Sequence, residues 1–132
     1  MSRPFSVPPI TRHQRDKFAP YRLEGYTAEN RCEWLPVTFN PETQCGSYYF
    51  KMLPGAVTIA HVHPGFEEFY VLEGEAVESD GTVIKAGDFI SFPPGSYHST
   101  RTDKGCLVLV FEWLPLMISL QIPAARRSSG IL

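Results

Sequence analysis

Residues 55–74 read Gly-Ala-Val-Thr-Ile-Ala-His-Val-His-Pro-Gly-Phe-Glu-Glu-Phe-Tyr-Val-Leu-Glu-Gly, and residues 87–98 read Gly-Asp-Phe-Ile-Ser-Phe-Pro-Pro-Gly-Ser-Tyr-His. In both stretches, apolar and aromatic residues lie between glycines and prolines, as in short β-strands separated by turns. The first stretch places His61 and His63 two residues apart on one expected strand. Side chains at positions i and i+2 of a strand share a face, so both imidazoles can reach the same ion.

The same pattern of short strands and turn residues continues through the central region of the chain. We expect strands at residues 34–39, 47–53, 57–62, 68–72, 76–78, 82–84, 89–92, 98–100 and 106–113, with a further strand at 115–122. Asp80–Gly81 predicts a two-residue hairpin turn of type I′, which needs positive φ at both positions. Many short strands at even spacing predict an all-β sandwich or barrel, with no helix in the centre.

The chain divides into three expected parts. Residues 1–31 contain four prolines and several basic residues with weak periodicity, so we expect an N-terminal arm there. This arm is either a partly ordered tail or a segment that packs on a neighbouring subunit. The barrel is expected at residues 32–122, and residues 123–132 are expected to form a flexible C-terminal tail.

Composition excludes several classes of protein. The chain is 43% apolar and 20% charged with a net charge of −2, and its central region has no basic patch, so we expect no nucleic-acid partner. No run approaches the roughly 18 apolar residues of a membrane span, and we identify no signal peptide. Three cysteines at irregular spacing, Cys32, Cys45 and Cys106, predict free thiols in a reducing compartment. We therefore expect a cytoplasmic protein.

Glycines around the histidines follow a recognisable spacing. The first stretch contains Gly55, His61, His63, Glu67 and Gly74, which are separated by five, one, three and six intervening residues. The second stretch contains Gly87, Pro93, Gly95 and His98, which are separated by five, one and two intervening residues. This arrangement resembles the two-motif signature of the cupin superfamily, except that Thr102 stands where the family often has Asn. The resemblance covers about residues 34–113.

The resemblance implies a fold, an assembly and a metal site. A cupin of this size is an all-β, jelly-roll-like double-stranded β-helix barrel, which we expect to form a homodimer. The implied ligands of one divalent transition metal ion are His61, His63, Glu67 and His98. The family's spacing selects Glu67 over Glu68, and alternation along the strand turns Glu68 to the opposite face. Whether Glu67 coordinates directly stays open, because some cupin dioxygenases hold iron through three histidines alone.

The barrel is also expected to contain a small-molecule pocket beside the metal. Residues in step with Glu67 on its strand should line this pocket, and on the preceding strand Tyr49 and Lys51 share one face while Tyr48 and Phe50 share the other. Our candidates for the pocket wall are Tyr49, Lys51, Phe69, Val71, Phe92, Tyr97 and Phe111. Plain core packing is the alternative role for each aromatic residue.

Residues 63–75, 92–98 and 105–110 narrow the resemblance to one cupin branch. This branch contains the acetylacetone-cleaving dioxygenase, dihydroxyacetophenone dioxygenase and the cupin domain of zinc-binding anti-sigma factors. It implies a metal-dependent cupin, first of all a dioxygenase that cleaves a small diketone or hydroxyketone. Iron(II) is the first-choice metal, with zinc, nickel or manganese as alternatives. A non-catalytic metal or ligand sensor, or a metal-dependent isomerase or decarboxylase, stays open because the same barrel hosts all of these.

Overall fold

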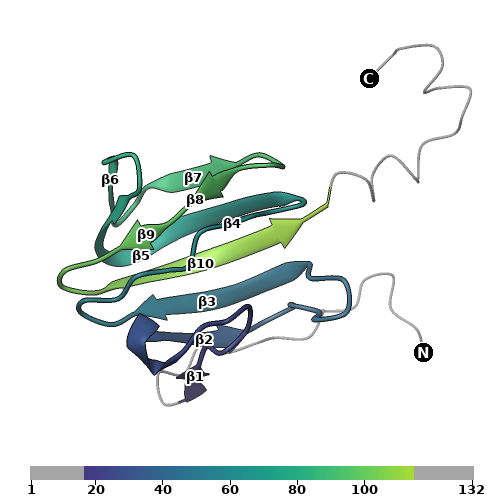
Figure 1. Cartoon of the computed structure of the whole chain (residues 1–132), viewed down its shortest axis with the longest axis horizontal. Helices are drawn as coiled ribbons and strands as arrows, with labels where there is room; N and C mark the ends of the chain where they lie inside the picture. The colour runs from purple at the N-terminus through teal and green to yellow at the C-terminus, as the bar shows by residue number, and fades with distance from the viewer. Residues whose placement is uncertain (1–16, 115–132) are drawn as a thin grey trace, which may run out of the picture.

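The computed structural model describes residues 17–114, and their regular secondary structure consists almost entirely of antiparallel β-strands joined by loops and turns (Figure 1). The strands are β1 (Ala19–Pro20), β2 (Cys32–Pro36), β3 (Gly46–Met52), β4 (His61–Val62), β5 (Phe66–Glu78), β6 (Val83–Lys85), β7 (Phe89–Phe92), β8 (Tyr97–His98), β9 (Thr100–Arg101) and β10 (Cys106–Trp113). One short 3-10 helix, η2 (Ala28–Asn30), precedes β2. The expected strand at 115–122 and the expected tail at 123–132 lie outside the described residues.

Strand β5 organises the sheet. The main path of hydrogen-bonded neighbours runs β1-β2-β3-β10-β5-β6, and both β7 and β9 also pair with β5. Strands β3, β10 and β5 lie side by side across the middle of the molecule (Figure 1). Strands β4 and β8 form a separate two-stranded sheet. This antiparallel arrangement confirms the expected all-β class.

The sequence predicted two strands here, at residues 68–72 and 76–78, with a break between them. This prediction is wrong, because β5 is one continuous strand of 13 residues that includes these positions. Gly74 allows this with a φ of +79°. A Cβ on Gly74 would lie 2.2 Å from the carbonyl oxygen of Gly105, in the turn before β10. A residue without Cβ therefore lets β5 bend while β10 stays close to it.

The expected hairpin after β5 is present, but its turn is longer than predicted. Residues Ala76 and Ile84 pair across β5 and β6, and Glu78 N–H donates to the Thr82 carbonyl at 2.8 Å. Three residues therefore form the loop, and Gly81, with a φ of +92°, is its one residue with positive φ. A three-residue loop that ends in a left-handed glycine is the next most common hairpin connection after type I′.

The described part of the expected N-terminal arm, residues 17–31, packs on its own chain. Strand β1 pairs with β2, where Ala19 lies opposite Trp34. The buried ring of Tyr21 makes edge-to-face contacts with Tyr26, Trp34 and Phe50 at centroid distances of 4.8, 5.1 and 5.3 Å. Such geometry is the favoured one for aromatic pairs. This segment therefore contributes to the hydrophobic core of the barrel.

Two further observations concern the whole described region. Cys32, Cys45 and Cys106 are free, as expected, and burial raises the pKa of Cys32 to about 12 and that of Cys106 to about 11. Such thiols stay protonated and unreactive at neutral pH. Among residues 17–114, no helix is long and apolar enough to cross a membrane.

Candidate metal centre

Strand pairing brings residues from distant parts of the sequence together at one site. Strands β4 and β8 pair so that His61 lies opposite His98. The next residue but one, His63, is held against the loop before β8, since its carbonyl accepts from Gly95 N–H at 2.9 Å. Glu67 lies near the start of β5. The pairing of β4 with β8, together with the position of β5 in the main sheet, therefore sets the relative positions of these four side chains.

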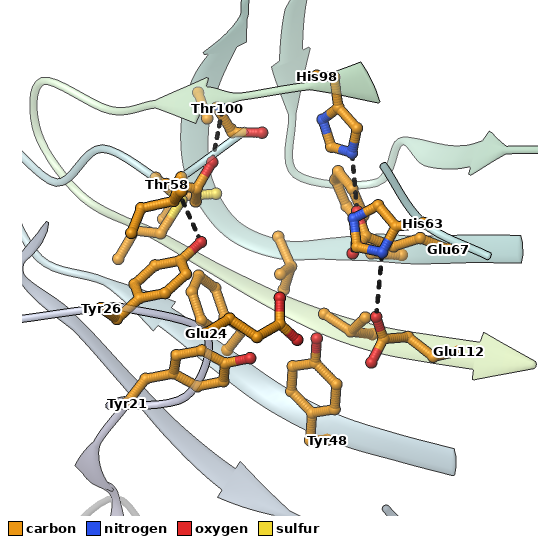
Figure 2. A pocket seen from close by; sticks show the side chains of 18 of the residues that line it. Tyr21, Glu24, Tyr26, Tyr48, Thr58, His63, Glu67, His98, Thr100 and Glu112 are labelled. Atoms are coloured by element: carbon orange, nitrogen blue, oxygen red, sulfur yellow. Dashed lines mark hydrogen bonds and ion pairs between the residues drawn. The ribbon is translucent and has the colours of Figure 1, made fainter. Parts of the chain in front are cut away.

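The imidazoles of His63 and His98 converge on the carboxylate of Glu67 (Figure 2). His63 Nε2 lies 3.2 Å from Glu67 Oε2, and His98 Nε2 lies 2.8 Å from Glu67 Oε1. The side chains of His63, His98 and Glu67 are 12%, 11% and 13% exposed, respectively. They form a largely enclosed cluster of nitrogen and oxygen donors.

This donor set fits a transition metal ion. One donor atom from each of His63, Glu67 and His98 lies within 4.8 Å of the others. Ligands at about 2.1 Å from one ion are about 3.0 Å apart when they are neighbours at right angles and about 4.2 Å apart on opposite sides, so the separations in this cluster are compatible with one shared ion. Imidazole with carboxylate suits zinc, iron and nickel. The structure brings Glu67 and not Glu68 to this point, because Glu68 instead accepts from Ser91 Oγ and Trp113 Nε1.

His61, the fourth expected ligand, lies beside this cluster with a different partner. Its ring centroid is 4.3 Å from that of His63. Its Nε2 lies 2.6 Å from Glu24 Oε2, while its Nδ1 lies 3.0 Å from the Ile59 carbonyl oxygen, which fixes Nδ1 as the hydrogen-bond donor. An ion bound at His61 Nε2 would have to displace Glu24 or share its carboxylate.

The ring of His98 is fixed from several sides. Its Nδ1 lies 2.8 Å from Glu78 Oε1, and the buried Glu78 also accepts from Thr100 Oγ1. Phe92 stacks on the imidazole at a centroid distance of 3.7 Å and an interplanar angle of 1°. A carboxylate on the far nitrogen sets both the tautomer and the orientation of a metal-binding histidine.

The pKa values of His98 and His63 are shifted in opposite directions. For His98, burial lowers the pKa, but the hydrogen bonds and charges of Glu67 and Glu78 outweigh it and raise the pKa to about 9. For His63, burial lowers the pKa, the charge of Glu67 opposes this, and the neighbouring histidines lower it further. Without a metal, His98 is therefore the protonated member of the pair at neutral pH.

A second carboxyl group, that of Glu112, faces the cluster from β10. Glu112 lies opposite Glu67 in the pairing of β10 with β5, and its Oε1 is 3.6 Å from His63 Nδ1 (Figure 2). Burial and the nearby charges of Glu67 and Glu24 raise the pKa of Glu112 to about 8, although a hydrogen bond from Tyr48 lowers it. Glu112 is therefore mostly protonated, and uncharged, at neutral pH.

The cluster opens into a cavity of about 60 Å³ inside the barrel. Polar side chains at one side of this cavity belong to the metal centre and its neighbours, and Figure 2 shows phenol rings of Tyr21, Tyr26 and Tyr48 on the other. The apolar part of the lining is Phe50, Met52, Ile59, Phe69, Ala76, Ile84, Val108 and Val110. A mostly apolar cavity with a few convergent polar groups is typical of a small-molecule site.

Of the seven residues expected in the pocket wall, Phe69 is the one that lines this cavity. Val71 is fully buried in the core, and Phe92 lies behind His98. Tyr97 and Phe111 are exposed at 68% and 36% and face away from the core.

The expectation for β3 selected the wrong face of the strand. Tyr48 and Phe50 are buried and line the cavity, whereas Tyr49 and Lys51 do not. Lys51 instead lines a separate cavity of about 300 Å³. Alternation shows which residues share a face, but the face that turns inward depends on the pairing of β3 with β2 and β10.

Comparison with known proteins assigns the family. The sequence model of the ChrR cupin-like domain matches residues 25–114, which include all the residues of the metal centre except Glu24. The chain belongs to the ChrR cupin-like family. As a cupin, it has the double-stranded β-helix barrel that its two motifs predicted. The cupin fold generally binds a transition metal, and this chain contains a histidine and glutamate cluster that could hold one.

Curated relatives and solved structures agree with this assignment. A 3-hydroxyanthranilate 3,4-dioxygenase of Xanthomonas campestris is 31% identical over 102 residues, which cover 70% of this cupin and 58% of the relative. The cupin therefore spans little more than half the length of that enzyme. An acetylacetone dioxygenase of Acinetobacter johnsonii superimposes with a TM-score of 0.66 at 16% identity, over 85% of this cupin and 78% of the other chain. A polyketide cyclase of Streptomyces resistomycificus superimposes with a TM-score of 0.62 at 22% identity, over 78% of each chain. At these identities the superpositions show the fold.

Three acidic residues of this cupin's site were missed by the sequence analysis. Glu112 follows Val108 and Val110 on the inward face of β10, and Glu78 follows Ala76 on the inward face of β5. An acidic residue in step with buried apolar ones is a readable signal, because burying a carboxyl group without a partner is costly. Glu24 gave no such signal, since it lies in a turn far from His61 in the sequence.

Proposed function

We propose that this cupin binds one divalent transition metal ion through His63, Glu67 and His98, with His61 as a further ligand once Glu24 releases it. The observation that carries the proposal is the convergence of three donor atoms within 4.8 Å of one another at the side of a cavity inside the barrel. Glu78 would hold His98 in the tautomer that presents Nε2 to the ion.

We further propose that the loaded protein is a dioxygenase of small diketones or hydroxyketones, with iron(II) as its metal. Iron(II) held by histidine and carboxylate ligands keeps open positions and supplies oxygen activation. The residues of this chain would exclude bulk water and orient a substrate whose two oxygen atoms are at chelating distance. The apolar wall that includes Phe50, Phe69 and Val108 suits the carbon skeleton of such a molecule.

The names of similar proteins support an oxygen-dependent reaction. Both the curated relative and the first of the superimposed structures are named as dioxygenases. A cyclase and a proposed oxalate decarboxylase of Thermotoga maritima, at a TM-score of 0.55, share the same barrel. The fold therefore supports several reactions, and the donor set with its adjoining cavity is the evidence from this chain itself.

Oxygen consumption tests the reaction. Protein loaded anaerobically with iron(II) is mixed with acetylacetone, or with a hydroxyketone, in an oxygen electrode. We expect uptake that depends on both iron and substrate and that His63→Ala abolishes. Glu68→Gln, which alters a neighbouring carboxylate bound to Ser91 and Trp113, is the matched control and should keep the activity.

The alternative function is a non-catalytic sensor of a metal or small ligand. This alternative is retained because the name of the matched family, the ChrR cupin-like domain, specifies no reaction. A sensor predicts that metal or ligand raises the melting temperature without any turnover. If iron-, nickel- and manganese-loaded protein all bind ligand but none consumes oxygen or ligand, the dioxygenase proposal fails and the sensor remains.

A further inference from the structure

We propose that the hydroxyl group of Tyr21 recognises an oxygen atom of the bound ligand, at the end of the ligand remote from the metal. The preferred ligand is then a hydroxyketone that carries a further hydroxyl group beyond the two oxygen atoms that face the ion. The inference deepens the proposed function and rests on it, since it concerns the molecule that occupies the cavity beside the metal centre.

Tyr21 reaches the cavity from a segment at the edge of the sheet. It directly follows β1, and its N–H donates to the Cys32 carbonyl at 3.0 Å, which anchors the backbone against β2. The family model matches residues 25–114, so Tyr21 lies outside the matched part of the chain. The family match therefore does not describe this side of the cavity.

The ring of Tyr21 is held in place by other aromatic rings. Tyr26, Trp34 and Phe50 contact it edge to face, and Tyr48 stacks beside it at a centroid distance of 6.5 Å and an interplanar angle of 24°. A ring packed in this way cannot turn its hydroxyl group toward another partner unless its neighbours repack. The hydroxyl therefore has a defined position at the cavity wall.

The hydroxyl of Tyr21 is buried without a hydrogen-bond partner from the described part of the chain. The residue is 7% exposed. Among residues 17–114, its hydrogen bonds, with Cys32 and Arg22, are made by its backbone, and none is made by its Oη. A buried tyrosine hydroxyl usually has a partner, because burying it alone costs free energy. This hydroxyl is therefore available to donate to a ligand atom or to accept from one.

The other two phenols of the cavity are already engaged by the protein. The Tyr26 hydroxyl accepts from Ile59 N–H at 3.0 Å, and the Tyr48 hydroxyl is hydrogen-bonded to the carboxyl group of Glu112. Of the three phenols, Tyr21 is thus the one whose hydroxyl group is free for recognition of a ligand.

Tyr21 and the metal centre lie on different sides of the cavity. The lining includes Tyr21 as well as His63, Glu67 and His98, and the cavity has a volume of about 60 Å³. Figure 2 shows the Tyr21 hydroxyl directed into the space between the phenol rings and the metal centre. In so small a cavity, a molecule whose chelating oxygen atoms face the ion has its other end close to Tyr21. An oxygen atom at that end would pair with the hydroxyl, whereas a methyl group would leave the hydroxyl buried and unpaired.

Hydroxyacetone and dihydroxyacetone are the matched ligands for the test. Both are uncharged three-carbon hydroxyketones with a carbonyl and a neighbouring hydroxyl group for the ion, and dihydroxyacetone has a further hydroxyl group on its other end. Zinc-loaded protein is titrated with each, and the shifts of its NMR signals give dissociation constants without turnover. We expect dihydroxyacetone to bind roughly three- to tenfold more tightly, as one additional neutral hydrogen bond contributes.

Variants assign this preference to one hydroxyl group. Tyr21→Phe removes the hydroxyl and keeps the ring, so it should abolish the preference by weakening the binding of dihydroxyacetone alone. Tyr26→Phe is the matched control, because it makes the same change at a phenol of the same cavity whose hydroxyl is bound to Ile59 N–H. It should leave the ratio of the two affinities as it is in the wild-type protein.

The stability of the ligand-free protein provides a second readout. Tyr21→Phe deletes a hydroxyl group that has no partner, so the urea midpoint should stay unchanged or rise. Tyr26→Phe should lower the midpoint, because Ile59 N–H then loses its acceptor. A midpoint lowered as much in Tyr21→Phe as in Tyr26→Phe would show that the Tyr21 hydroxyl has a partner within the protein, and it would overturn the inference.

Failure of the inference is distinguishable from failure of the proposed function. If the wild-type protein binds both hydroxyketones equally, or if the preference persists in Tyr21→Phe, the role of Tyr21 is wrong while the metal site and the substrate class stand. Binding of acetylacetone alone would also overturn the inference and would leave diketones as the substrate class. If the zinc-loaded protein binds neither hydroxyketone, nor acetylacetone, the substrate class of the proposed function is wrong as well.

Discussion

Glu78 Oε1 lies 2.8 Å from His98 Nδ1, on the side of the imidazole ring opposite the proposed metal. The two residues are 20 positions apart in the sequence and come together because β9, which follows His98, pairs with the end of β5. Glu78 is buried and accepts a second hydrogen bond from Thr100 Oγ1. The carboxylate is thereby held in place, so it can hold the histidine in turn.

Replacing this carboxylate should weaken metal binding without removing a ligand. We expect Glu78→Gln to lower zinc affinity by roughly 10–100-fold, because the neutral amide no longer supports the Nδ1–H tautomer as strongly. Competition with a chromogenic chelator measures the affinity, and NMR titration of the metal-free protein should show a lower pKa for His98. The exposed Glu75→Gln, on the same strand, is the control. Unchanged affinity together with an unchanged pKa would refute this role.

The stability of the metal-free protein should fall as pH rises from about 6.5 to about 9. The pKa of His98 is raised from 6.5 to about 9, so the folded state binds more protons than the unfolded state in this range. Glu112, with its pKa raised from 4.5 to about 8, acts in the same direction. The lowered pKa of His63 acts below pH 6.5, outside the window.

Urea denaturation in the presence of a chelator measures this dependence. Each group that differs fully in protonation contributes up to about 1.4 kcal/mol per pH unit. His98→Asn should flatten the slope between pH 6.5 and 9, because it removes one of the two titrating groups. A stability that rises over this range in the wild-type protein would contradict the arrangement of His98 between two carboxylates.

Gly74→Ala should destabilise the barrel by more than about 2 kcal/mol, since it combines a strained backbone with a steric clash. The added Cβ would lie 2.2 Å from the Gly105 carbonyl oxygen. Gly81→Ala is the matched control, because Gly81 also has a positive φ but its Cβ would meet nothing within 4 Å. Denaturant midpoints measure both. Equal losses in the two variants would mean that the approach of β10 to β5 is not as close as described.

Glycines and prolines at the ends of strands explain which elements could be predicted from the sequence. The bounds of β7 and β10 agree with the expected strands, because Gly87, Pro93 and Gly105 mark their ends. Continuous β5 was read as two strands, because a glycine in a turn and a glycine that admits a neighbouring strand look the same in a sequence. The difference depends on Gly105, which is distant in the chain.

For the candidate site, too, residues in local motifs could be predicted, whereas contacts between distant parts of the chain could not. Motif spacing selected His63, Glu67 and His98, which the structure places together, and predicted His61, which the structure places beside them. The inward face of β3 and the approach of Glu24 to His61 depend on strand pairing and on the path of residues 17–31. No local pattern carries that information, so neither could be predicted.

Metal content tests the central claim most directly. Protein purified without added metal and then loaded with zinc or iron(II) is dialysed and measured by elemental analysis, alongside His63→Ala, His98→Ala and the control Glu68→Gln. We predict one bound ion per chain in the wild-type protein and in Glu68→Gln, and loss of most of it in both histidine variants. Circular dichroism shows whether each variant is folded. Full metal content in folded His63→Ala and His98→Ala would contradict the account.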